Sequence, residues 1–357
     1  MHSIETNNSI VHFNQKVYNE LNNYLKKTQP SKVFILTDTN THHHCLPYFL
    51  TQIDYSDTLI EVMEMPYGES HKTLEICLGV WEALSEYLAD RNSLMINLGG
   101  GVVTDLGGFV ASTYLRGLSY INVPTSLLAM VDASVGGKTG IDLGHLKNHI
   151  GVINEGSMVL IDAHYLKTLP EREVISGYAE ILKHGLISSL DYWETVKQIN
   201  FDNFESLADI IHQSVKIKQS IVSEDINEAG LRKILNFGHT LGHAVESYFL
   251  NRDEDNALLH GEAIAIGLIL ESFLSHHTVS LSEDALYDIS NVLISTYGKT
   301  SLPKAAQNEI VKLLIHDKKN SHGKIQFVLL QDIGQPILDQ TVSDPLIYKA
   351  FDYYNSL

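Results

Sequence analysis

The residues from Arg232 to Glu246 combine, at helical spacing, side chains that could bind a metal ion or an anion. On an ideal helix with about 100° per residue, five of them share an arc of roughly 80°: Arg232, Asn236, His239, His243 and Glu246. A solvated helix face usually carries lysine and glutamate, whereas this face carries asparagine and two histidines. Gly238 and Gly242 each weaken a helix by about 1 kcal/mol relative to alanine. Their presence therefore indicates that another group packs closely against the backbone. The segment therefore predicts one helix that faces a metal ion or another ligand.

Two other segments carry candidate metal-site residues. A helix is expected over Glu171–Leu190. Glu180 and Lys183 are three residues apart in it and therefore lie on the same helix face. His260 begins an otherwise apolar helical segment, where the helix dipole disfavours a cationic histidine and leaves the neutral form that binds metals. One glutamate and two histidines with an open position are typical of catalytic zinc sites.

The spacing leaves the choice of histidines open. His239 and His243 are favoured as a pair because residues i and i+4 share a helix face. Histidines that are buried and hydrogen-bonded within a core, with no metal, are the alternative.

A strand expected over Ser93–Leu98 runs into the triple glycine Gly99–Gly101 and a helix of small residues. This order places backbone N–H groups and the positive end of a helix dipole against a phosphate. The G-x-G-x-x-G pattern is incomplete, because Thr104 stands at the third glycine. The motif indicates a phosphate-bearing cofactor, with a merely tight turn as the alternative.

Gly137-Lys138-Thr139 resembles the end of an ATP-binding P-loop, but Asp132 stands at the position of the first glycine. We therefore exclude an ATP site of that kind. A lysine beside glycine can still hold a phosphate or carboxylate as a point charge. Lys147 and Asn148 are expected to continue the same glycine-rich loop.

The elements that must position these residues change character near residue 165. Strand-like segments at 32–38, 93–98, 118–123 and 158–161 alternate with helical ones, which predicts a largely parallel, doubly wound sheet. The remainder is mostly helical up to a strand expected at 325–330. We predict a Rossmann-like α/β domain over 1–165 and a helical domain over 166–357, with a cleft between them. His42–His44 is expected in a loop, because three adjacent side chains cannot point one way on a helix or strand.

Composition limits the partners of the chain. Its 357 residues carry a net charge of 25 − 43 = −18, which argues against nonspecific nucleic-acid binding. An anionic ligand would need basic residues concentrated locally. No apolar run approaches the ~18 residues of a membrane span. Cys45 and Cys77 are the only cysteines, and the first residues lack the basic start of a signal peptide, so we expect a cytoplasmic protein.

Taken together, these segments resemble the 3-dehydroquinate synthases of the sugar-phosphate cyclase family. Each match is weak alone, but the ordered set is highly specific and covers most of residues 32–330. The matching runs are Gly68–Lys72, Gly99–Gly108, Tyr114–Gly117, Pro124–Gly140, Lys147–Asn148, Thr168–Arg172, Gly177–Lys183, Asn236–Glu246, His260–Gly267 and Asp317–Lys319.

The resemblance implies an NAD-binding α/β domain, a helical metal domain and an active site in the cleft between them. It assigns the zinc (or cobalt) ion to Glu180, His239 and His260, so the pair favoured by spacing would be wrong. The implied NAD-contacting positions are Asp38, Asn40, Glu69, Lys72, Gly99, Gly100, Gly101, Asp105, Thr125, Ser126, Lys138, Lys147 and Thr168. The implied catalytic or substrate-binding positions are Arg116, Asp132, Lys138, Lys147, Asn148, Lys183, Lys218, Arg232, Asn236, His243 and Lys318. Arg116 would reach across a homodimer interface, and Lys319 is an alternative to Lys318.

The implied reaction converts 3-deoxy-D-arabino-heptulosonate 7-phosphate to 3-dehydroquinate and phosphate, on the shikimate pathway to chorismate and the aromatic amino acids. Transient oxidation with NAD precedes phosphate elimination, reduction, ring opening and intramolecular aldol closure. This anionic substrate would need basic residues concentrated at its site. Seven of the 25 basic residues fall at matched site positions: Arg116, Lys138, Lys147, Lys183, Lys218, Arg232 and Lys318.

Departures from the family pattern, such as Thr104 and His149, remove no charged or metal-binding group. The first alternative is a related cyclase such as 2-deoxy-scyllo-inosose synthase. Lys218 and Arg232 argue against this alternative, because they match carboxylate-binding positions. The second is a glycerol-dehydrogenase-like, metal-dependent oxidoreductase. A non-catalytic zinc-stabilised scaffold would leave the matched lysines without a role.

Overall fold

The computed structural model describes residues 1–54, 58–144, 146–199, 201, 204–250, 252, 257–314 and 325–357. Lys318 and Lys319 lie outside them. Packing divides the chain into two compact units. The first comprises Met1–Val174 and Phe201–Ile226, and the second comprises Ile175–Asn200 and Asn227–Leu357. A functional division at residue 165, into an NAD-binding and a metal-binding domain, stays a prediction.

The first unit is built on a sheet whose described strands have the order β1-β2-β9-β6-β5-β3-β4. The β1–β2 pair is antiparallel and the other pairs are parallel, which confirms the predicted fold class. Strands β3 and β5 are buried along almost their whole length, as expected where helices cover both faces of a sheet. The strands are β1 (Ile4–Glu5), β2 (Ile10–Phe13), β3 (Val33–Asp38), β4 (Ile60–Met65), β5 (Leu94–Gly99), β6 (Ser119–Pro124) and β9 (Met158–Ile161).

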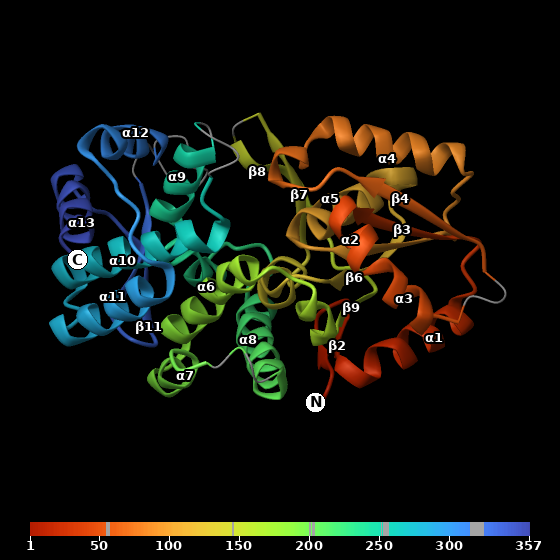
Figure 1. Ribbon diagram of the computed structural model, residues 1–357, viewed down its shortest axis with the longest axis horizontal. Helices are drawn as coiled ribbons and strands as arrows, with labels where there is room; N and C mark the ends of the chain where they lie inside the picture. Colours follow the sequence, from red (N-terminus) through yellow and green to blue (C-terminus); the bar gives the residue numbers. More distant parts are fainter. Residues whose placement is uncertain are drawn as a thin grey trace. The chain divides into compact units, whose positions relative to one another are not determined.

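Helices α1 and α4 lie on opposite sides of these strands (Figure 1). Side chains of α4 and α5, including Val80, Leu84 and Leu106, form an apolar core with Phe34 and Met95 of the sheet. The helices of this unit are α1 (Val17–Thr28), α2 (Thr39–His44), α3 (Leu46–Gln52), α4 (Leu74–Glu86), α5 (Gly101–Thr113) and α8 (Phe204–Glu224).

Two local predictions are wrong in this unit. His42–His44 forms the last turn of α2, because Asp38 caps the helix and its Oδ1 accepts from Thr41 N at 2.7 Å. Strands β7 (Lys138–Leu143) and β8 (Leu146–Ile153) pair antiparallel, where the sequence predicts a glycine-rich loop. Gly140 and Gly151 face each other in this ladder, and a Cβ on either would overlap the opposite backbone.

The second unit is mostly helical, as predicted, with one described hairpin. Helix α10 is buried around its circumference, and in Figure 1 it lies among α9, α11 and α13. Its elements are α6 (Glu171–Ser188, from Ile175 on), α7 (Leu190–Val196), η6 (Leu231–Asn236), α9 (His239–Leu250), α10 (His260–Val279), α11 (Glu283–Tyr297), α12 (Lys304–Leu314), β10 (Phe327–Asp332), β11 (Gln335–Gln340) and α13 (Asp344–Ser356).

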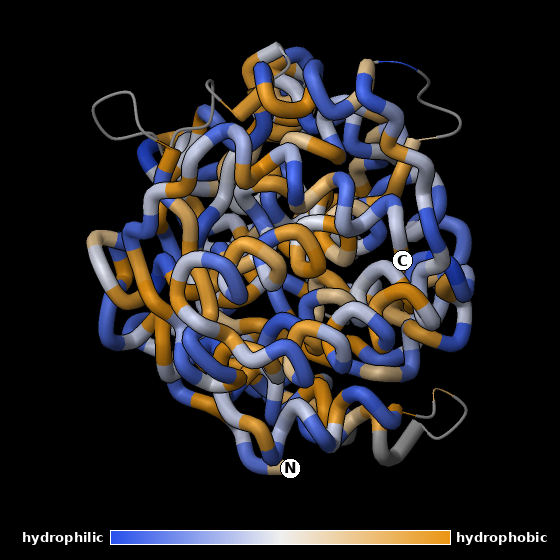
Figure 2. The backbone as a smooth tube through the Cα atoms, turned by 90° about the vertical axis from the view of Figure 1, so that its left-hand side faces the viewer, coloured by the Kyte–Doolittle hydropathy of each residue, from blue (hydrophilic) through white to orange (hydrophobic). Residues whose placement is uncertain are grey.

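Hydrophobic and hydrophilic residues alternate along the trace in Figure 2, as expected of elements that each bury one face. Within the described ranges, no helix has both the length and the apolar character needed to cross a bilayer.

Candidate functional site

The segment from Arg232 to Glu246 is not one helix. The 3₁₀ helix η6 ends at Asn236, Gly238 adopts a positive φ of 79°, and α9 begins at His239. The prediction that five polar side chains share one helix face is therefore wrong. The break is stabilised by the buried carboxylate of Glu271, which accepts from Gly238 N at 2.7 Å and from Leu241 N at 2.9 Å. These bonds satisfy N–H groups that the start of a helix leaves without an intrahelical partner.

The glycines of this segment serve the packing of α9 against α10. A Cβ on Gly242 would lie 2.8 Å from Ile264 Cδ1 and 3.2 Å from Ile264 Cα. A Cβ on Gly267 would overlap the carbonyl oxygen of Gly238 and lie 2.7 Å from Gly242 N. The close approach to the backbone that the sequence indicates is thus made by a neighbouring helix.

Helices α6, α9 and α10 bring Glu180, His239 and His260 together, with their ligand atoms within 4.8 Å of one another. The Nε2 atoms of both histidines lie 3.3 Å from Oε1 of the fully buried Glu180. Ligand atoms ~2.0–2.1 Å from a tetrahedral zinc ion are about 3.3 Å apart, so this spacing fits such an ion.

Charges around this cluster act on the three side chains differently. Burial would raise the pKa of Glu180, but Lys183 and His239 outweigh it and hold this pKa well below its usual range. Burial, together with Lys183, lowers the pKa of His239, so its ring is neutral. Burial also lowers the pKa of His260, but Glu246 and Glu180 outweigh it and raise the pKa to about 10. In the metal-free chain, therefore, these carboxylates override the helix-dipole argument for a neutral His260.

His243 lies one turn after His239, with ring centroids 5.1 Å apart. It belongs to a second group of possible ligands, formed with Glu246 and His260. The structure thus presents two overlapping donor sets that share His260.

In the first unit, the triple glycine connects β5 to α5. Gly100 is the N-cap of α5, and no described side chain caps this helix end. The backbone N–H groups at the start of α5 are therefore suited to bind a phosphate. Thr104 fits at the position of the missing glycine, because its Oγ1 donates to the carbonyl oxygens of Gly100 and Gly101, at 3.2 and 3.1 Å.

A network around the buried Lys72 joins residues expected at the NAD site to residues of the β7–β8 hairpin. Lys72 Nζ donates to Asp105 Oδ2 at 2.6 Å and to Asn148 Oδ1 at 2.5 Å. Lys147 Nζ lies 3.3 Å from Glu69 Oε1. Burial would lower the pKa of Lys72, but Asp105 and Glu69 outweigh it and raise this pKa, so the lysine is charged.

Asp132 lies on a π-helical turn, η4 (Ala129–Ala133). Lys218 of α8 donates to its side-chain Oδ1 at 2.7 Å and to its backbone oxygen at 2.6 Å. Single π turns occur frequently at functional sites, and this one brings together two residues expected to bind substrate.

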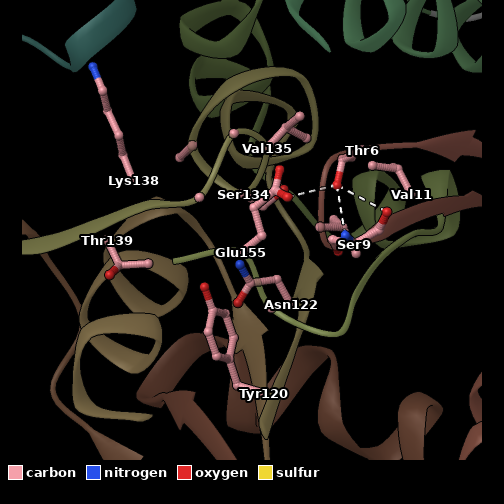
Figure 3. Close-up of a pocket in the computed structure, with 15 residues that line it drawn as sticks. Thr6, Ser9, Val11, Tyr120, Asn122, Ser134, Val135, Lys138, Thr139 and Glu155 are labelled. Atoms are coloured by element: carbon pink, nitrogen blue, oxygen red, sulfur yellow. Dashed lines mark hydrogen bonds between the residues drawn. The ribbon is translucent and has the colours of Figure 1, made fainter. Parts of the chain in front are cut away.

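A small pocket beside this turn has Asn122 and Glu155 in its lining (Figure 3). Glu155 Oε2 accepts from Thr6 Oγ1 at 3.0 Å and from Asn8 N at 2.7 Å. Lys138 extends away from the pocket in Figure 3. Because a carboxylate repels anions, this pocket does not suit a phosphate.

The other predicted residues of the first unit lie mainly where strands or short helices end. The carboxyl ends of parallel strands meet at one sheet edge, where α/β proteins bind nucleotides. The predicted residues concerned are Asp38 at the end of β3, Asn40 in α2, Thr125 and Ser126 after β6, Arg116 in η3 (Tyr114–Arg116), and Thr168 after η5 (Ala163–Lys167).

In the second unit, Lys183 is buried and forms an ion pair with Glu180. Arg232 is also buried, on η6. Asn236 Nδ2 donates to Glu228 Oε1 at 2.7 Å.

Sequence reasoning missed two carboxylates near the cluster. Glu271 anchors the start of α9, and its signal was a glutamate within the apolar sequence of α10. Glu246 is one of the five residues that the sequence places on one helix face, but the sequence assigns it no role. Its Oε2 lies 3.4 Å from His260 Nδ1.

Comparisons with known proteins agree on one family. Residues 62–176 match the family model described as "3-dehydroquinate synthase N-terminal", and residues 177–320 match "3-dehydroquinate synthase C-terminal". The chain is 40% identical over 337 residues to the 3-dehydroquinate synthase of Parabacteroides distasonis, covering 94% of each chain.

Two solved structures have the same fold. A 2-deoxy-scyllo-inosose synthase, complexed with carbaglucose-6-phosphate, NAD⁺ and Co²⁺, has a TM-score of 0.83 and 24% identity over 99% of each chain. The 2-epi-5-epi-valiolone synthase of Streptomyces hygroscopicus, with NAD⁺ and Zn²⁺ bound, has a TM-score of 0.83 and 24% identity over 100% of this chain and 99% of that one.

Proposed function

Because this chain belongs to the 3-dehydroquinate synthase family, we propose that it converts 3-deoxy-D-arabino-heptulosonate 7-phosphate to 3-dehydroquinate and phosphate. The observation that carries the proposal for the site is the convergence of both histidine Nε2 atoms on one Glu180 oxygen, at 3.3 Å each.

Glu180, His239 and His260 would hold the divalent metal, zinc or cobalt. When bound, the ion supplies a Lewis acid that stabilises negative charge on the oxygen of the reacting carbonyl. The ion pair with Lys183 keeps Glu180 ionised, and burial keeps His239 neutral, so both present lone pairs.

The turn Gly99–Gly101 and the start of α5 would hold the phosphates of NAD, whose chemistry is reversible hydride transfer. Lys72 and Asp105 would contact NAD, as the resemblance assigns them. The remaining NAD-contacting assignments made from the sequence are proposed with them.

Basic residues would bind the carboxylate and phosphate of the substrate. Lys218 and Asp132 are already paired in the first unit, and Arg232 and Lys183 are buried in the second. The positive charges of Lys218, Arg232 and Lys183 would offset the repulsion that a chain of net charge −18 exerts on an anionic substrate.

We further propose a cytoplasmic homodimer in which Arg116 completes the partner's site. Supporting this, Leu115 and Arg116 are exposed and both adopt positive φ, of 49° and 69°. Backbone strain of this kind clusters at functional sites.

The reaction is tested by measuring phosphate release from the heptulosonate phosphate, with and without NAD and a chelator. We expect release to need both cofactors and to proceed without net NADH absorbance, because NAD is regenerated in each turnover. Release that persists after both are removed would contradict the proposal. Stoichiometric NADH would instead indicate a glycerol-dehydrogenase-like oxidoreductase, and a preference for a hexose 6-phosphate without a carboxylate would indicate another cyclase.

Metal binding should tighten as the pH rises. His260 holds a proton below its pKa of about 10, and the ion must displace that proton. The apparent association constant should therefore increase about tenfold per pH unit between pH 6 and 8, because one proton is released. Competition with a chelator at several pH values, corrected for the chelator's own protonation, measures this slope. A slope of zero would show that His260 is already neutral.

A further inference from the structure

The two histidines of the cluster each present a second ring nitrogen to an acceptor. His239 Nδ1 lies 3.1 Å from the carbonyl oxygen of Phe237, and His260 Nδ1 lies 3.4 Å from Glu246 Oε2. The opposite nitrogen, Nε2, of each ring lies 3.3 Å from Glu180 Oε1. An outer acceptor of this kind keeps the proton on Nδ1 and leaves the lone pair on Nε2 for an ion.

The two outer acceptors differ in kind. The carbonyl of Phe237 lies two residues before His239, so the turn at the start of α9 positions it locally. Glu246 lies in the second half of α9 and reaches the first residue of α10. Its carboxylate is 5% exposed, and burying a charge is costly unless it has partners. The His260 ring is therefore held by a contact between two helices, whereas the His239 ring is held by a carbonyl group two residues away.

We propose that Glu246 is a positioning residue of the metal site, which accepts the Nδ1 proton of His260 and orients Nε2 toward the ion. The inference rests on the proposed metal site and adds a residue beyond its three ligands. A carboxylate acceptor also makes the ring nitrogen Nε2 a stronger electron-pair donor to the ion than a neutral acceptor would.

A competing arrangement would make Glu246 itself a ligand, together with His243 and His260. The two arrangements exclude each other, because Nδ1 of His260 cannot carry a proton and coordinate an ion. The first is favoured by the two equal distances from histidine Nε2 atoms to the buried oxygen of Glu180.

The test compares Glu246→Gln and Glu246→Ala in the full-length chain. Zinc affinity is measured by chelator competition at several pH values and corrected for the protonation of His260, because loss of the Glu246 charge also lowers the pKa of His260. Cobalt binding is measured by its visible absorption. Glutamine keeps an acceptor oxygen but not the charge, so we expect affinity to fall about tenfold in Glu246→Gln and about 100-fold in Glu246→Ala. Both variants should bind one ion per chain with the cobalt spectrum of the unaltered protein.

Glu309→Gln is the matched control, because Glu309 also belongs to the second unit but pairs with Arg252 at the surface. Its zinc affinity should be unchanged, and circular dichroism of the metal-free variants checks their folding. Unchanged affinity in Glu246→Gln would overturn the inference, whether or not Glu246→Ala folds. A changed cobalt spectrum would make Glu246 a ligand and overturn it as well. Failure of the unaltered chain to bind zinc would overturn the proposed metal site together with this inference.

Discussion

His260→Ala should abolish stoichiometric metal binding and reduce turnover by on the order of 10³-fold or more, whereas His243→Ala should retain the metal and only weaken turnover. His260 Nε2 is one of two imidazole nitrogens 3.3 Å from Glu180 Oε1, so its removal leaves two of the three proposed ligands. A bound ion contributes several kcal/mol of charge stabilisation, and each 1.36 kcal/mol corresponds to a factor of ten in rate.

The measurement is metal content after dialysis, with phosphate release assayed in parallel on the same preparations. His243 has the same residue type and lies one turn from His239, which makes it a matched control for loss of an imidazole. Metal loss in both variants would favour the second donor set, with Glu246, and would overturn the proposed ligand assignment. Retention of the metal by His260→Ala would contradict both donor sets, because both contain His260.

Gly267→Ala should destabilise the second unit by about 3 kcal/mol, the upper end of the usual cost of overpacking a core. The added Cβ would overlap the carbonyl oxygen of Gly238, and backbone cannot rotate away as a flexible side chain can. Helix α10 would have to move away from α9. Because His239 and His260 lie on these two helices, metal affinity should fall as well.

Thermal unfolding followed by circular dichroism, with and without zinc, measures the effect. Gly79→Ala is the control, because Gly79 lies within α4 and a Cβ there would meet nothing within 4 Å. That variant should be more stable by up to about 1 kcal/mol, from helix propensity alone. Gly267→Ala with unchanged stability and zinc affinity would show that α9 and α10 can separate without cost.

Much of the fold could be predicted from local patterns. The segments 93–98, 118–123 and 158–161 are apolar runs bounded by turn residues, and each is a strand of the sheet. The helical character of the later half was equally evident. Errors arose where pairing between segments decides local structure, as in β7 and β8, which are strands because each pairs with the other.

The stretch from Arg232 to Glu246 separates the two kinds of information most clearly. The sequence by itself determined the family, through the order of its motifs, and the residue types available for a site. It could not place those residues in space, because ideal helical spacing assumes an unbroken helix. Only the tertiary structure decided that Glu271, on another helix, holds a break at Gly238. Packing against α10 then brings His260 beside His239, and Glu246 beside His260. These contacts join residues 14 to 33 positions apart, a range at which spacing along the chain carries no information about distance.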